Sequence, residues 1–275
     1  MNEAVAERIE NIALTFRSGQ AIAQEEKEFD AIVARLNDLE LDFRAVGYEG
    51  AAMALVMTRG TSITKYEKWW DPTLSPVPNY RDHLLMGYGW AMAATQLDVD
   101  RLNGEFQPMD RARILDGFGY YHGLFRKRQA VIGAQVPENL TSEQLHLFDR
   151  GLGRALWYIA KGDIQVALTL AGRFDESRQE ALWTGIGLAC TFVGGSSIED
   201  LQNILEHISG RAIAFKTGIV LAYLARITTN SVDPFATAYC EHILEGSKDQ
   251  VLNAIASANY DDQSQIVHAI KQHLS

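Results

Sequence analysis

The segment Gly151-Leu152-Gly153-Arg154-Ala155-Leu156 decides the fold, because close copies of it recur along the chain. The four other copies begin at Gly47, Gly87, Gly117 and Gly185, and a weaker sixth copy occupies residues 217–222. The first glycines of successive copies lie 40, 30, 34, 34 and 33 residues apart. A period of about 34 residues is typical of helix-turn-helix repeats. The sequence therefore predicts an all-α fold of helical-hairpin repeats, similar to a tetratricopeptide-type solenoid, with helical caps at its ends.

Helix start and stop signals place the hairpins most clearly in the C-terminal half. Ser142 and Ser197 are suitable N-caps, and Gly162 and the Gly194-Gly195 pair are suitable stops. Long helices followed by short partners are predicted over residues 143–161 and 164–174, 178–193 and 198–208, and 212–227 and 234–244. Two amphipathic helices are predicted at 2–17 and 20–39, and two shorter capping helices near 248–257 and 262–273. No segment sustains the period-two alternation of a strand.

We expect a single all-α domain over residues 1–275. It has N-terminal helices in 1–40, helical repeats in 41–245 and a C-terminal cap in 246–275. A long loop over residues 58–80 interrupts the repeat. It explains why the first two copies of the segment lie 40 residues apart, more than the later ones. Loops of this length are uncommon in compact arrays and are usually functional or wrapped over the surface. Trp69-Trp70 would either anchor this loop to the body or cover a pocket.

The paired glycines inside the predicted helices need a physical reason. Glycine within a helix costs about 1 kcal/mol relative to alanine. Without a side chain, two helix axes can approach more closely than the usual spacing of roughly 8–10 Å. We therefore interpret the glycines as helix-packing positions. The alternative is that some of them line a space where a ligand approaches the backbone.

Charge and cysteine usage exclude several classes of protein. The formal net charge is −10, whereas proteins that bind nucleic acid or anionic membranes carry basic patches. Cys190 and Cys240 cannot build a disulfide framework, and this usage fits a reducing compartment. The N-terminal residues lack a signal-peptide pattern, and no apolar run reaches the roughly 18 residues of a membrane span. We expect a soluble cytoplasmic protein.

The common catalytic and cofactor motifs are missing from the sequence. The chain has no GxSxG, Walker, CxxC or HExxH motif, and its GxG pairs lack the third glycine of a dinucleotide site. Its seven histidines are scattered. We therefore expect neither a metal nor a cofactor.

Charged residues within the apolar repeat helices are the remaining candidates for chemistry. They are Glu49, Asp116, Arg150 and Arg154. A buried charge must be paired or shift its pKa, so we expect these side chains to meet on a shared inner face. Two interpretations are open: a structural ion-pair network, or a polar cluster at the base of an aromatic pocket for an apolar ligand. The pocket would be formed by Tyr48, Trp90, Tyr120, Trp157 and Trp183, with Arg150 as a further substrate contact.

The same segments resemble a bacterial family of unknown function whose members accompany enediyne polyketide synthase gene cassettes. The resemblance covers about residues 40–245 and rests on residues 47–54, 87–92, 115–122, 150–158 and 185–195. It implies a part in polyketide or related secondary-metabolite biosynthesis. It supplies no settled reaction and no catalytic residues.

The leading hypothesis is a helical-repeat protein that binds an apolar, polyketide-like intermediate. If the protein is an enzyme, cofactor-free cyclisation or isomerisation demands least of the residues present. Glu49 or Asp116 would then be the acid or base, His122 a proton partner, and Arg154 the stabiliser of developing negative charge. The alternative is a non-catalytic accessory that docks a polyketide synthase or carrier protein on a concave repeat surface. A general peptide-binding adaptor is a third hypothesis.

Overall fold

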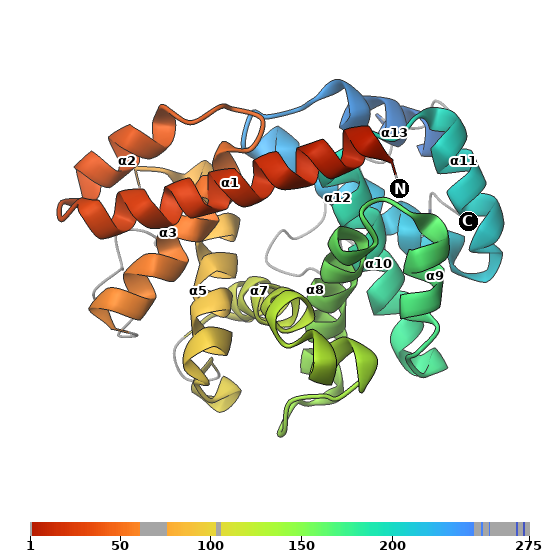
Figure 1. Cartoon of the computed structure of the whole chain (residues 1–275), viewed down its shortest axis with the longest axis horizontal. Coiled ribbons are helices and arrows are strands. Elements are labelled where there is room, and N and C mark those ends of the chain that lie inside the picture. Colours follow the sequence, from red (N-terminus) through yellow and green to blue (C-terminus); the bar gives the residue numbers. More distant parts are fainter. Residues whose placement is uncertain are drawn as a thin grey trace.

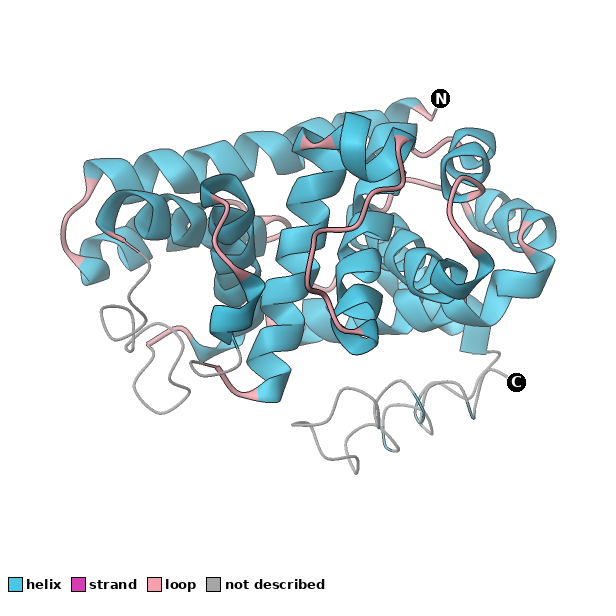
Figure 2. Cartoon of the chain, turned by 90° about the horizontal axis from the view of Figure 1, so that it is seen from below, coloured by secondary structure: helices cyan, strands magenta, loops and turns pink. Residues whose placement is uncertain are grey.

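The computed structural model describes residues 2–60, 76–102 and 106–244, together with the single positions 249, 253, 268 and 272. Within these ranges every regular element is a helix and no strand occurs (Figure 2). The predicted all-α class is therefore confirmed. The predicted capping helices near 248–257 and 262–273, and Trp69-Trp70, lie outside the described residues.

Long and short helices have different places in the molecule (Figure 1). The long helices are α1 (Glu3–Glu25), α3 (Arg44–Arg59), α5 (Arg81–Thr95), α7 (Pro108–Phe125), α8 (Ser142–Ala160), α10 (Glu176–Val193) and α12 (Ala212–Thr228). From α3 to α12, each long helix packs on the next one in this order. The short helices, on the periphery, are α2 (Phe29–Asn37), α9 (Ile164–Ala171), α11 (Ile198–His207) and α13 (Pro234–Leu244). The long helices thus form the inner wall.

The glycine pairs lie where neighbouring long helices touch. A Cβ atom at Gly151 of α8 would lie 1.9 Å from the Asp116 carbonyl oxygen of α7. A Cβ atom at Gly153 would lie 2.1 Å from the Leu182 carbonyl oxygen of α10. The first glycine of this pair therefore faces the preceding helix and the second faces the following one. The pairs in α5, α7 and α10 repeat this arrangement, so the packing interpretation of the glycines is confirmed.

The row of helices closes on itself. Arg226 of α12 is fully buried, and its Nη1 atom lies 2.8 Å from Asp42, which directly precedes α3. Arg8 of α1 lies 3.0 Å from the same aspartate and 2.7 Å from Asp233, and it also donates to the Val193 carbonyl at the end of α10. Helix α1 therefore crosses from α3 to the end of α10. The sequence did not predict this closure.

Several predicted helix boundaries are wrong. Helix α1 continues through residues 18–19 and ends at Glu25, because Gly19 packs against the Gly47 carbonyl of α3 instead of breaking the helix. The N-cap of α8 is Thr141, whose side chain forms a capping box with Gln144. The six helices predicted in the C-terminal half are present, as α8 and α9, α10 and α11, and α12 and α13.

The N-terminal half has no such regular hairpins in its described part. Among the described residues, a short turn, η3 (Val99–Arg101), lies between α5 and α7, and a π-helical turn, η4 (Arg128–Ile132), lies between α7 and α8. Of the segment expected as a loop at 58–80, residues 58–59 belong to α3 and residues 61–75 lie outside the described residues. Its last three residues form a 3₁₀ turn, η2 (Pro78–Tyr80), which leads directly into α5.

Candidate functional site

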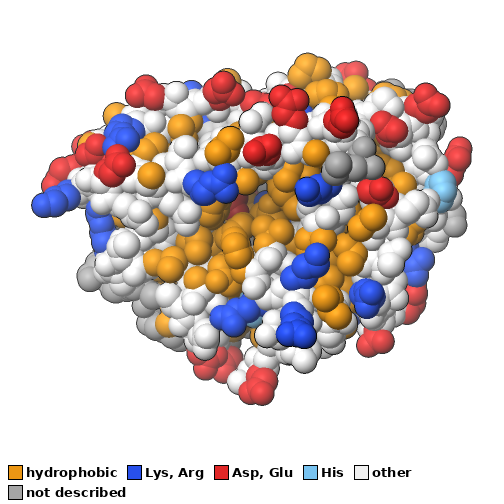
Figure 3. Space-filling view, viewed as in Figure 1, with side chains coloured by type: hydrophobic (Ala, Val, Ile, Leu, Met, Phe, Trp, Pro, Cys, Tyr) orange, Lys and Arg blue, Asp and Glu red, His pale blue; other side chains and the backbone are white. Residues whose placement is uncertain are grey.

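A cavity of about 460 Å³ lies inside the wall of long helices, with α1 along one side. Figure 3 shows hydrophobic side chains gathered around a hollow in the middle of this face, with several Lys and Arg side chains nearby. We call this hollow the central cavity. It is lined by Ile12, Ala13, Phe16, Arg17, Gln20, Val46, Glu49, Met53, Met57, Trp90, Ala94, Tyr120, Tyr121, Leu124, Phe125, Arg154, Tyr158 and Phe192.

Glu49 is a buried carboxyl in the wall of this cavity. Its side chain accepts a hydrogen bond of 2.7 Å from Trp90 Nε1, and the residue is 2% exposed. A Cβ atom at Gly87 would lie 2.2 Å from the Glu49 carbonyl oxygen, so α5 approaches α3 closely enough for Trp90, one turn later, to reach the carboxyl. Burial raises the pKa of Glu49 to about 7, against the smaller opposing effects of Arg154 and the Trp90 hydrogen bond.

Asp116 holds two arginines beside the cavity. Its two carboxylate oxygens lie 2.6 Å from Arg150 Nε and 2.7 Å from Arg154 Nη1. All three residues are at most 5% exposed. Burial would raise the pKa of Asp116, but the two guanidinium groups hold it below its ordinary value. Asp116 is therefore ionised at neutral pH and fixes the position of Arg154.

Aromatic rings extend from Arg154 along the cavity wall. The Arg154 guanidinium lies over the Tyr120 ring, 4.5 Å from its centroid. The Tyr120 ring lies edge-on to Trp90 at 4.8 Å and 5.4 Å from Tyr158. The Phe16 ring of α1 also contacts Trp90, at 4.6 Å between ring centroids. The cavity thus has an aromatic wall with one arginine and one carboxyl, a composition that suits a largely apolar ligand.

Comparison with known proteins places the chain in a family. Residues 1–270 match the family described as Protein of unknown function (DUF1702). The chain belongs to this family. No curated protein and no solved structure matches it. The matched region of this DUF1702 protein includes all the described helices, so every wall of the central cavity is part of the family region.

Six of the sequence-predicted site residues of the DUF1702 protein come together. Glu49, Trp90, Tyr120 and Arg154 line the central cavity, and Asp116 and Arg150 are joined to Arg154 by ion pairs. The expected pairing of charges is correct for the aspartate and the two arginines. Glu49 differs from that expectation, because its hydrogen bond comes from Trp90.

The other four predicted residues lie away from the central cavity. His122 is in a separate surface hollow with Arg126 and Glu138, and burial lowers its pKa to about 4. Tyr48 stacks on Tyr80 at 4.2 Å. Trp157 and Trp183 belong to the solid core, where both are at most 1% exposed. Successive helical residues point about 100° apart, so Tyr120 faces the cavity and His122 does not.

Several cavity residues were not predicted from the sequence. Tyr158 lies four residues after Arg154 on the same face of α8, a spacing that could have identified it. Phe192 lies near the end of α10. Phe16 and Arg17 belong to α1, which carries no copy of the repeated segment. The one signal in α1 is Gly19, a lone glycine inside an amphipathic helix.

The described residues of the DUF1702 protein contain neither a cluster of metal ligands nor a membrane-spanning helix. Within them, His, Cys, Asp and Glu side chains form no group of three or more that could hold a metal ion. None of the described helices is long and apolar enough to span a bilayer.

Proposed function

We propose that this DUF1702 protein binds an apolar small molecule in the central cavity and isomerises or cyclises it without a cofactor, with Glu49 as the acid or base. One observation carries the proposal: a carboxyl that is 2% exposed lines an apolar cavity and has its pKa raised to about 7. A general acid–base group works best when its pKa is close to the operating pH. Glu49 meets this condition at neutral pH.

The roles of the neighbouring residues follow from their contacts. Ionised Glu49 takes a proton from a carbon of the ligand and returns it at another position, so that ligand and product have the same composition. Arg154 stabilises the negative charge that develops between the two steps. Asp116 and the Tyr120 ring hold the Arg154 guanidinium in place, so it need not reorganise during the reaction.

The size of the cavity is consistent with a small-molecule ligand. Ligand pockets commonly enclose roughly 300–1,000 Å³, and the central cavity encloses about 460 Å³. Its aromatic wall favours a flat or unsaturated molecule, because rings stack on such surfaces. The sequence resemblance to proteins of enediyne polyketide cassettes supports a polyketide-type intermediate as the substrate class. A cytoplasmic site of action is part of the same proposal.

The regular glycine contacts support a further element of the proposal, that the long helices are repeats of one unit bent into a ring.

An accessory role, docking a polyketide synthase or carrier protein, remains the alternative function. Repeat proteins usually dock partners in an open concave groove. In this chain the arginine and the carboxyl are at most 5% exposed and line an aromatic-walled cavity of about 460 Å³, which favours a small ligand over docking.

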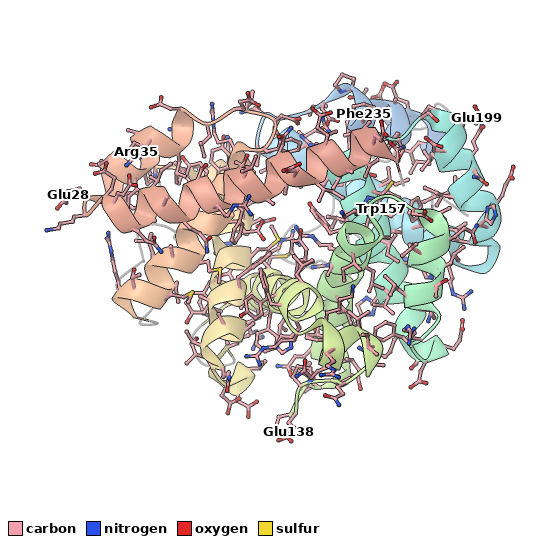
Figure 4. All side chains as sticks on the ribbon, viewed as in Figure 1. Glu28, Arg35, Glu138, Trp157, Glu199 and Phe235 are labelled. Carbon is pink, nitrogen blue, oxygen red and sulfur yellow. The ribbon has the colours of Figure 1, made fainter. Side chains whose placement is uncertain are left out.

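The test compares Glu49→Gln with Glu28→Gln, a matched control at an exposed position in the turn between α1 and α2 (Figure 4). Binding is measured with N-phenyl-1-naphthylamine, a neutral apolar fluorophore, and turnover by incubation with the product of a polyketide synthase. We expect Glu49→Gln to keep fluorophore binding within about twofold and to lose conversion by about a hundredfold or more. Glu28→Gln should match wild type in both assays.

Each other outcome counts against the proposed reaction. If wild type does not bind the fluorophore, the central cavity is not a ligand site. Equal conversion by wild type and Glu49→Gln would remove the catalytic role of this carboxyl. A variant that loses thermal stability alone would support a structural ion-pair network. Capture of the synthase or its carrier protein without any conversion would support docking.

A further inference from the structure

A second cavity lies against the same arginine. It encloses about 320 Å³ and is formed by η2, α5, α7, α8, α10 and α12. Arg154 and Phe192 line both this cavity and the central one, so these two side chains form the partition between them. No wall residue of the second cavity comes from α1 or α3. We call it the arginine cavity, because Arg81, Arg113, Arg150 and Arg154 all line it.

The charges around the arginine cavity leave a positive excess. Arg113 is paired with Asp82 at 2.7 Å. Arg81 is paired with Asp110 at 2.6 Å. The remaining two arginines share the single carboxylate of Asp116. These ion pairs of the described residues thus join four guanidinium groups to three carboxylates, in a protein whose formal net charge is −10.

Three residues that line this cavity each carry a buried nitrogen atom without a hydrogen-bond partner among the described residues. These atoms are Arg150 Nη2, Arg154 Nε and His83 Nδ1. Arg150 and His83 are each 4% exposed, and both line the cavity. Buried polar groups of folded proteins almost always have a hydrogen-bond partner. Asp116 accepts from Arg150 Nε and Arg154 Nη1, so its hydrogen bonds do not involve Arg150 Nη2 or Arg154 Nε.

The opposite wall of the arginine cavity is apolar. Leu188 of α10 and Leu221 and Leu224 of α12 line it together with Met109. A small hydrated anion would leave this wall without a contact. An anion that carries an apolar tail would fill both halves, since the tail removes hydrocarbon surface from water as it binds.

We propose that the arginine cavity is a second binding site, which takes a carboxylate with an apolar tail. The carboxylate accepts from Arg150 Nη2 and from the His83 ring, and the tail lies on Leu188, Leu221 and Leu224. Charge-assisted hydrogen bonds of this kind are the strongest that a guanidinium group forms. The site is separate from the central cavity, and it stands whether or not Glu49 is catalytic.

Blocking variants distinguish the two sites. Ala225 is a half-buried residue of the arginine cavity, and Ala13 is a half-buried residue of the central cavity. Ala225→Trp and Ala13→Trp each place a large ring in one cavity and leave the other unchanged. Octanoate is titrated into the full chain by calorimetry, with 1-octanol as the uncharged ligand of equal chain length. Circular dichroism checks that each variant is folded.

We expect Ala225→Trp to weaken octanoate binding by about tenfold or more and Ala13→Trp to leave it within about twofold. Arg150→Gln should weaken octanoate by a similar factor, because it removes a charged donor, and should leave 1-octanol binding unchanged. Octanoate binding that survives Ala225→Trp, or that is lost in Ala13→Trp, would overturn the proposal. So would equal affinity of wild type for octanoate and 1-octanol. Binding of the fluorophore should be weakened by Ala13→Trp and left unchanged by Ala225→Trp. Failure of the arginine site and failure of the central site therefore give different results.

Discussion

Trp90 Nε1 donates a 2.7 Å hydrogen bond to the Glu49 carboxylate across the contact between α5 and α3. This bond lowers the pKa of Glu49, whereas burial raises it to about 7. Replacing Trp90 by Phe removes the donor and keeps an aromatic ring in the cavity wall. We expect the pKa of Glu49 to rise above its wild-type value in Trp90→Phe, measured from the carboxyl infrared band as a function of pH. An unchanged or lower pKa would show that the hydrogen bond is not formed in solution.

The raised pKa of Glu49 predicts how stability depends on pH. Between about pH 4.5 and pH 7 the unfolded chain ionises this group while the native protein keeps it protonated, so the native state loses stability as pH rises. The loss is about 3 kcal/mol and is complete above about pH 7. Glu49→Gln does not titrate and should lack this component. Urea unfolding of both proteins at pH 4.5 and pH 7 measures the difference, and parallel pH dependence would contradict it.

Gly151 should tolerate no side chain. Its Cβ atom would lie 1.9 Å from the Asp116 carbonyl oxygen, and the nearest atoms are all backbone atoms of α7, which cannot rotate away as a side chain can. We expect Gly151→Ala to lower the free energy of unfolding by at least about 3 kcal/mol. Gly210→Ala is the matched control, since nothing lies within 4 Å of its Cβ position, and it should be neutral or slightly stabilising. Equal thermal midpoints for the two variants would refute the close-packing account.

Arg226 should be essential for closing the row of helices. Its side chain is fully buried. Its Nη1 atom lies 2.8 Å from Asp42, and its Nη2 atom lies 3.3 Å from Asp233. Arg226→Met leaves these carboxylates without their buried partner and should destabilise the protein by about 3–5 kcal/mol. Amide hydrogen exchange should increase first in α1 and near Asp42.

The control for Arg226→Met is Arg35→Met. Arg35 forms exposed pairs with Glu25 and Glu26, and its side chain is 42% exposed. Exposed ion pairs contribute little, so this variant should change stability by less than about 1 kcal/mol. If both variants behave alike, closure does not depend on the buried arginine.

The wall of helices could be predicted because its cause is local in the sequence. Paired glycines within apolar helices have few physical explanations other than close packing, and Gly151 and Gly153 serve that purpose. The partnership of Asp116 with Arg150 and Arg154 was predictable for a similar reason, since buried charges require partners.

The closure and the exact lining of the cavity depend on contacts that periodicity does not encode. Arg8 meets Asp233 across 225 positions of the chain. His122 is two residues from Tyr120, yet a rotation of about 200° along the helix takes it to another surface. Both residues belong to the same copy of the repeated segment. The packing of α7 against its neighbours decides which of them faces the cavity.

Helix α1 acts as a strut of fixed length. Its 23 residues span about 35 Å, and it is anchored at α3 by Gly19 and at the end of α10 by Arg8. An open solenoid can gain or lose a unit during evolution, because each unit touches its neighbours alone. In this closed row an added or deleted long helix would change the gap that α1 must bridge, so the number of long helices and the length of α1 can change only together.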